Sequence, residues 1–339
     1  LYKGLSITGM FSFDTYNYTS NRFTKSPNTY HATGRDANGN LIYEQTRQGT
    51  ENLAYSLSAK GDRTIYLEAA LNYKNTFGRH DVSGMLLFNQ SDEINTKATN
   101  VEEALPYRFR GLAGRFTYGF DDRYFAEFNF GYNGSENFTP KNRYGFFPSV
   151  GLGWVISNES FWDGIRKTVS NLKIRVSYGL AGNDALGERF PYRSIVAMGE
   201  ESGFYYNWNS QGKGPKITTY GNPNATWEEA KKLDVGLELG LFNALNIEAA
   251  YFTEDRTGIF MRRTSLPSST GLLGVTPYGN IGRVKSHGVD LSAVYNKQFN
   301  KDWSLSLRGT FTFSRNEVVE KDEGDLMYDY MSVVGHPVN

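Results

Sequence analysis

Residues 124–133 alternate strictly between apolar and polar side chains, and this period of two limits the fold more than any other feature of the chain. One face carries Glu127, Gly131 and two asparagines, with Phe125 as the exception at its end. The other face is made of Tyr124, Ala126, Phe128, Phe130 and Tyr132. Such a period is typical of a β-strand whose two faces meet different surroundings. Strands of a soluble β-sandwich are short and closely spaced, whereas segments of about ten residues or more indicate a transmembrane β-barrel.

The same alternation recurs along the whole chain. It is clear at 65–74, 172–180, 234–241 and 303–313. Weaker alternation predicts further strands at 5–14, 82–90, 107–119, 145–157, 246–260 and 283–296. The sequence therefore predicts an all-β, antiparallel sheet of about eleven spanning strands, with 51–59 as a possible extra strand.

The connections between these strands alternate in length. Short ones lie near residues 78, 121, 243 and 300, and long ones cover 15–62, 92–106, 183–227 and 261–280, while 158–170 is a mid-length exception among the short ones. Outer-membrane barrels have short periplasmic turns and long extracellular loops, so 15–62 and 183–227 are expected outside. Trp154, Trp162 and Trp303 should then lie near the periplasmic rim.

Composition supports this interpretation and excludes other classes of protein. The 339 residues have a formal net charge of +0, which argues against nucleic-acid binding. The chain has 23 Tyr and 23 Phe, which suit the aromatic girdles of a barrel, and no apolar run long enough for a spanning helix. There is no Cys, and the four His (His31, His80, His287 and His336) lack the spacing of metal ligands. No cofactor, metal or catalytic residue is expected, and no nucleophile–base arrangement points to an enzyme.

Five stretches resemble, in the family's order, the SusC/RagA-type TonB-dependent transporters of Bacteroidetes. They read NYKNTFGRH at 72–80, NRYGFFPSVGLGWVIS at 142–157, NLKIRVSYGLAGN at 171–183, NPNATWEE at 222–229 and IGRVKSHGVD at 281–290. The resemblance implies a segment of an outer-membrane barrel domain, about half of a barrel of roughly 22 strands. It also implies a luminal plug and C-terminal strands that residues 1–339 lack, which makes the chain an internal piece of a longer protein.

What the family does supplies the leading functional hypothesis. The resemblance implies import of oligosaccharides or peptides, energised through TonB, with a SusD-like surface lipoprotein as a lid and outer-membrane lipid around the barrel. The alternatives are a passive porin or a structural or adhesive barrel and, from a different class, a soluble carbohydrate-binding β-domain.

Two sets of side chains are candidates for functional contacts. An aromatic cluster in the 183–227 connection is expected to contact substrate or the lid, because aromatic faces stack on sugar rings, although the rings could instead pack the loop. This cluster consists of Phe204, Tyr205, Tyr206 and Trp208. Mixed charges are expected to face the lumen, where they meet water or the plug: Glu68, Arg115, Glu127, Lys173, Arg175, Glu238, Glu248 and Arg308.

Two acidic stretches have simpler interpretations than a site. Residues 321–325, with Asp329 beyond them, lack the spacing of a calcium loop, so a solvated loop is expected there although calcium binding stays open. Glu228 and Glu229 follow Trp227 on opposite faces of a strand and cannot act as a catalytic pair. They are expected to be charges at the rim of the barrel.

Overall fold

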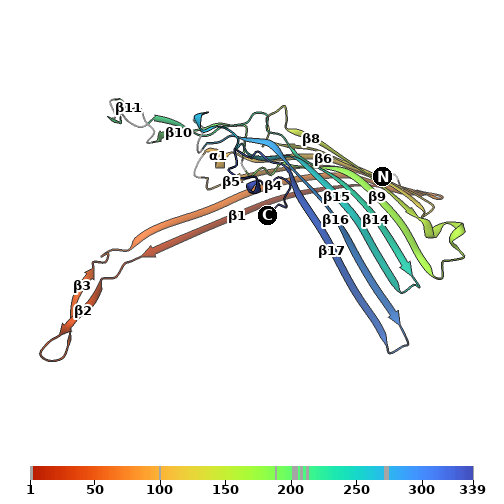
Figure 1. Ribbon diagram of the computed structural model, residues 1–339, viewed down its shortest axis with the longest axis horizontal. Helices are drawn as coiled ribbons and strands as arrows, with labels where there is room; N and C mark the ends of the chain where they lie inside the picture. Colours follow the sequence, from red (N-terminus) through yellow and green to blue (C-terminus); the bar gives the residue numbers. More distant parts are fainter. Residues whose placement is uncertain are drawn as a thin grey trace. The chain divides into compact units, whose positions relative to one another are not determined.

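One antiparallel sheet of eleven strands dominates the protein. The computed structural model describes residues 3–98, 101–187, 189–200, 205–206, 209–210, 214–270 and 275–338. The strands follow the chain in the order β1-β4-β5-β6-β7-β8-β9-β14-β15-β16-β17, so each lies beside the next strand of the sheet (Figure 1). They are β1 Leu5–Thr24, β4 Ala54–Phe77, β5 His80–Asn95, β6 Tyr107–Phe120, β7 Tyr124–Ser135, β8 Tyr144–Val155, β9 Val169–Asn183, β14 Glu228–Leu241, β15 Leu245–Arg262, β16 Tyr278–Gln298 and β17 Ser304–Glu320.

These eleven strands coincide with the eleven that the sequence predicts. Their lengths run from 12 residues in β7 and β8 to 24 residues in β4, long enough to cross a bilayer when tilted. The segment 51–59 is not a separate strand, because its residues from Ala54 onward belong to β4. Within the described part of the chain, β1 and β17 are the two edges of the sheet.

Small elements occupy the connections. Three two-stranded hairpins pair β2 Thr29–Arg35 with β3 Leu41–Arg47, β10 Ile195–Glu200 with β13 Gly214–Thr219, and β11 Tyr205–Tyr206 with β12 Asn209–Ser210. The helical turns are α1 Val101–Ala104, η1 Ile156–Asn158, η2 Ser160–Trp162, η3 Ser268–Thr270 and η4 Asp329–Met331. No helix in the described ranges has the length and apolarity needed to span a membrane.

The chain divides into two compact units. The first comprises Leu1–Phe11, Leu67–Ser91 and Arg108–Asn339, and the second Ser12–Tyr66 and Asp92–Tyr107. The second unit shows that the prediction of one long loop over 15–62 is wrong. β1 continues to Thr24, β4 starts at Ala54, and the β2–β3 hairpin lies between them.

The reason for this difference lies in the exposure of the second unit. Its strands expose both faces and are held together by backbone pairing and contacts such as the Tyr55 hydroxyl donating to Asn21 Oδ1 at 2.7 Å. The rings of Phe23 and Tyr55 lie 5.2 Å apart. Strands without a buried face give no pattern of burial in the sequence, so the alternation fades there although the strands continue.

Connections of the first unit alternate between two ends of the sheet, as the sequence predicts. At the short-connection end the turns follow β4, β6, β8, β14 and β16, and backbone hydrogen bonds join neighbouring turns. Asp121 N–H donates to Arg79 O at 2.8 Å, and Phe242 N–H to Thr168 O at 2.9 Å. The connections after β7, β9 and β15 lie at the opposite, long-connection end.

Two of the short turns use residues in the left-handed region. Asp121 and Asp122 have φ values of 55° and 54°, and Phe242 and Asn243 have 57° and 50°. In each turn the N–H of the fourth residue bonds the C=O of the first, at 3.0 Å for both Arg123→Phe120 and Ala244→Leu241. These are type I′ turns, whose twist matches that of the paired strands.

The two faces of the sheet differ in chemistry. On the apolar face, register places Val176, Val235, Tyr251 and Val289 side by side across β9, β14, β15 and β16. Their exposed fractions are 37, 40, 46 and 39 %, so this face is uncovered. The opposite, polar face carries the charged side chains predicted to face inward, such as Glu127, Lys173 and Glu238.

Candidate functional site

Ion pairs between neighbouring strands organise the polar face. Arg115 of β6 pairs with Glu127 of β7 at 2.8 Å, and Lys173 of β9 pairs with Glu238 of β14 at 2.9 Å. Arg175 Nη1 lies 2.5 Å from Asp234 Oδ1. All of these side chains remain partly exposed, which limits what each pair adds to stability. Together they form a hydrated wall of mixed charge with no excess of either sign.

The remaining predicted charges lie on the same set of strands. Glu248 of β15 is directly opposite Glu238 in register, and Arg308 of β17 is opposite Val294. Glu68 is a half-buried residue of β4. Whether these charges face a lumen stays a prediction.

Glycines open a hollow in this wall near the short-connection end. The hollow has a volume of about 480 Å³ and is lined by Gly119, Gly151 and Gly153 together with Glu127 and Arg175. A β-carbon at Gly151 or Gly153 would meet only ordinary contacts at 3.6 Å or more, so the space is not filled by neighbouring side chains. The polar face therefore has a depression with an acidic and a basic group beside exposed backbone.

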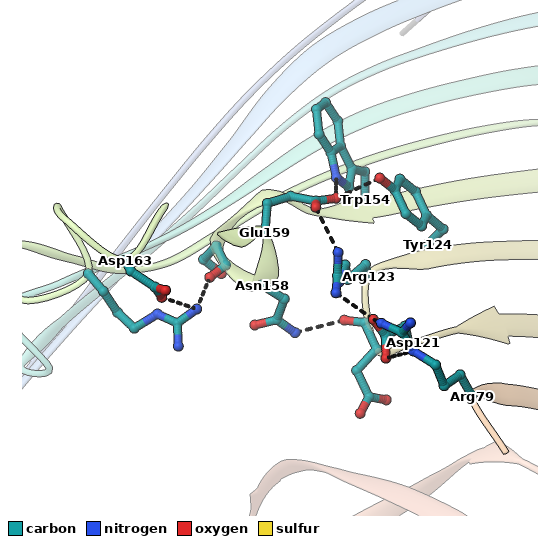
Figure 2. A network of polar contacts seen from close by, with 11 residues as sticks. Arg79, Asp121, Arg123, Tyr124, Trp154, Asn158, Glu159 and Asp163 are labelled. Carbon is teal, nitrogen blue, oxygen red and sulfur yellow. Dashed lines mark hydrogen bonds and ion pairs between the residues drawn. The ribbon is translucent and has the colours of Figure 1, made fainter. Parts of the chain in front are cut away.

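A network of polar contacts joins three turns at the short-connection end (Figure 2). Glu159 is central and only 8 % exposed. It accepts hydrogen bonds from the Tyr124 hydroxyl at 2.6 Å, Trp154 Nε1 at 3.1 Å and Arg123 Nη1 at 3.0 Å. These contacts confirm that Trp154 lies at the rim where an aromatic girdle is expected.

The network continues from Arg123 to the neighbouring turns. Arg123 Nη2 contacts Asp121 Oδ2 at 2.6 Å, and Arg79 forms a two-point pair with the same carboxylate. The side-chain amide of Asn158 donates to Asp122 O at 2.7 Å. Hydrogen bonding by Arg79, followed by the charge of Arg123, holds the pKa of Asp121 below its ordinary value. The turns after β4, β6 and β8 are thus tied together by charge-assisted hydrogen bonds.

Glu159 should make this end of the sheet sensitive to acid. Hydrogen bonds from Tyr124 and then Trp154, with the charge of Arg123, lower the pKa of Glu159 below its ordinary value of 4.5. A carboxyl with a lowered folded-state pKa adds stability above its unfolded pKa, and this stability is lost as pH falls through the folded pKa. We therefore expect Glu159→Gln to lower the melting temperature at neutral pH, and the difference from wild type to shrink below about pH 4.5.

Asp163→Asn is the matched control for this measurement. Asp163 lies in the same connection, its side chain is 73 % exposed, and it pairs only with Arg166 at 3.4 Å. Its melting temperature should follow that of wild type at every pH. A gap between Glu159→Gln and wild type that stays constant down to the acid limit would contradict the role of the ionised carboxylate.

An apolar core lies at the long-connection end. Trp227 is 6 % exposed, and its ring lies 5.2 Å from Phe138 and 5.3 Å from Phe147. Leu186, Ala225 and Phe260 complete the cluster. Phe147 packs closely over Gly182, where a β-carbon would come within 2.0 Å of the ring. This core fixes the ends of β8, β9, β14 and β15 together.

Glu228 is a correction to the sequence prediction of a rim charge. It is only 7 % exposed and accepts hydrogen bonds from Asn183 Nδ2 at 2.9 Å and from the Phe260 N–H at 3.0 Å. The carboxylate therefore closes the polar side of the apolar core. The sequence pattern placed Glu228 at a strand end but could not show that three other segments converge on it.

Asparagine amides were the functional detail that sequence reasoning missed. The Asn142 side chain donates to Ala225 O at 3.2 Å, and the Asn222 side chain donates to Tyr278 O at 3.0 Å. Asn280 donates to both Thr226 O and Gly258 O at 2.8 Å. Asn142 and Asn222 begin two of the family-like stretches, which is the one signal that could have identified them.

The predicted aromatic cluster is only partly described. Phe204 and Trp208 lie outside the described residues. Tyr205 and Tyr206 form β11 and pair with Ser210 and Asn209. A contact of this hairpin with substrate or a lid stays a prediction.

The acidic stretch after β17 bonds its own chain. Glu323 accepts hydrogen bonds from Ser332 Oγ at 2.7 Å and Val333 N–H at 2.8 Å, and Asp322 Oδ1 accepts from Ser265 N–H at 3.2 Å. Among the described residues there is no cluster of three or more acidic, His or Cys side chains suited to a metal ion. These carboxylates fold the segment after β17 back onto the long-connection end.

A sheet of this kind, with one uncovered apolar face and one charged face, defines a segment of an outer-membrane β-barrel. The chain matches the family described as "TonB dependent receptor-like, beta-barrel" over residues 3–339, and it belongs to that family. This is a family of outer-membrane receptors and not of enzymes.

Relatives and solved structures agree with this assignment. TonB-dependent receptor P3 of Formosa agariphila is 26 % identical over 96 % of this chain and 30 % of its own length. SusC of Bacteroides thetaiotaomicron is 27 % identical over 62 % of this chain and 21 % of its own length. The RagAB peptide importer in its "closed-closed" state shares the fold with a TM-score of 0.73 at 21 % identity, over 98 % of this chain and 37 % of that chain. The chain thus spans less than a third of the length of these curated relatives.

Proposed function

We propose that these strands are part of the channel wall of a TonB-energised importer that takes up oligosaccharides or peptides through the outer membrane. In this proposal the polar face lines the lumen and the apolar face meets lipid. The observation that carries it is the separation of the two faces. Cross-strand pairs such as Lys173–Glu238 lie on one face, and the exposed Val176 and Val235 lie on the other.

Energy coupling separates this function from a passive porin. Uptake by the full-length protein should stop in cells that lack TonB or whose inner-membrane proton gradient is collapsed. Uptake that continues under both conditions would favour a porin.

Capture of substrate is assigned to the 183–227 connection together with a SusD-like lipoprotein lid. Replacing Tyr205, Tyr206 and Trp208 with alanine in the full-length protein should lower uptake or lid association by at least about fivefold, since one stacked ring contributes about 1 kcal/mol. Barrel assembly should be unaffected, because none of the three lies on a spanning strand.

Tyr328→Ala with Tyr330→Ala is the matched control. These two rings stack on each other with centroids 5.5 Å apart and are 55 and 79 % exposed, but they belong to a different connection. Wild-type uptake and lid association in the 205/206/208 variant would mean that the aromatic cluster only packs the loop.

A further inference from the structure

The apolar face changes to a charged surface within two rows of residues toward the long-connection end. The last fully apolar row across β14–β17 is Val235, Tyr251, Val289 and Phe313. The next row is Leu233, Thr253, His287 and Arg315, and the row after it is Lys231, Asp255, Lys285 and Glu317. Because side chains two residues apart share a face, all three rows belong to the apolar face.

The distance between charged positions on this face matches a bilayer. Lys285 and Lys297 both lie in β16, 12 residues apart (297 − 285), with His287, Val289, Leu291, Ala293 and Tyr295 between them on the same face. At about 3.3 Å per residue and a tilt of about 45°, this separation is about 28 Å across the membrane. The apolar band of outer-membrane barrels is about 25 Å tall. The rows of Arg315 and Lys285 therefore lie at one boundary of the bilayer.

Basic groups exceed acidic ones at this boundary. Asp255 is held by Arg283 through two contacts of 2.8 and 2.7 Å, so its charge is neutralised. Lys231, Lys285 and Arg315 are exposed, and none of them forms an ion pair with any described residue. Glu317 is opposite Lys285 in register and offsets part of its charge. The row of Arg315 and His287 contains no acidic residue.

We propose that Arg315, Lys285 and Lys231 bind the phosphate groups of lipid head groups in the outer leaflet. This proposal rests on the assignment of the apolar face to lipid and of the long-connection end to the outside. An arginine fork binds phosphate at two points, and lysine supplies a compact charge. The aliphatic stems of these side chains can lie along the apolar surface while their charges reach the head groups. A lipid is favoured over free phosphate because Phe313 and Val289, exposed by 53 and 39 %, lie directly beside the cations and would contact acyl chains.

Native mass spectrometry of the full-length protein tests this proposal. The protein is released from mixed micelles of phosphatidic acid and phosphatidylcholine, and the retained phosphatidic acid is counted. Removing one cation should lower retention about fivefold, given about 1 kcal/mol per Lys or Arg at a lipid surface. The Arg315→Gln, Lys285→Gln and Lys231→Gln triple variant should lose more, and a variant with Arg315→Lys and Lys285→Arg should retain the lipid and show that the fold tolerates changes there.

The matched control changes two cations of β14 and β15 on the opposite face. Lys232 and Arg256 both pair with Glu254, at 3.3 and 2.9 Å, and their replacement with glutamine should leave lipid retention unchanged. Equal retention in the triple variant and wild type, or an equal loss in this control, would overturn the proposal. Displacement of the lipid by millimolar inorganic phosphate would overturn the choice of a lipid as ligand. Uptake is measured in parallel, so that a failure of the import function is distinguished from a loss of lipid binding.

Discussion

Leu291→Arg should destabilise the full-length protein in a bilayer by about 2–4 kcal/mol, the cost of an arginine facing lipid at mid-membrane. Leu291 is 40 % exposed on the apolar face and lies midway between Lys285 and Lys297 in β16. An arginine there has no polar partner within reach in the neighbouring residues Ala249 and Phe311. Urea unfolding of the protein in lipid vesicles measures the change.

Ser292→Arg is the control for Leu291→Arg. Ser292 is the next residue of β16, on the polar face, directly opposite Glu248 and Thr310. An arginine at that position gains an acidic neighbour and should be tolerated. If the two substitutions destabilise the protein equally, the assignment of the apolar face to lipid is wrong.

Trp227→Ala should have the largest effect at the long-connection end. It removes a buried ring from the cluster with Phe138 and Phe147 and the hydrogen bond from Trp227 Nε1 to Arg143 O at 3.2 Å. Truncation of a buried tryptophan costs about 3–5 kcal/mol. Hydrogen exchange should show faster exchange at residues 135–144 and 222–227, with little change in the turns at the opposite end.

Trp303→Ala gives the comparison for Trp227→Ala. Trp303 is 71 % exposed beside the turn before β17. Its loss should change stability by no more than about 0.5 kcal/mol, as is usual for exposed positions. A similar loss of stability in both variants would show that the cluster around Trp227 does not hold the connections together.

The strands of the sheet could be predicted because each has one face of apolar side chains. Alternation at 65–74 or 303–313 reports this difference directly, and antiparallel pairing of consecutive strands then sets the ends at which the connections lie. The same signal failed for 15–62, where both strand faces are exposed and no apolar pattern is required. Short-range periodicity therefore predicted the membrane-spanning part of the fold and not the second unit.

Contacts between connections could not be predicted from periodicity. The burial of Glu228 depends on Asn183 and Phe260, which lie 45 and 32 residues away in the chain. The pairing of Lys173 with Glu238 similarly depends on the register of β9 with β14. The sequence placed these charges on one face, but register decided which acid each base meets.

The order of strands in the sheet has a consequence for how the protein enters the membrane. Every strand lies next to its predecessor in the sheet, and the type I′ turns at 121–122 and 242–243 close the β6–β7 and β14–β15 hairpins with minimal loss of chain entropy. β9 and β14, by contrast, can pair only after residues 183–228 have been folded back. Assembly should therefore proceed by the addition of preformed hairpins, and the joining of β9 to β14 should be its slowest local step.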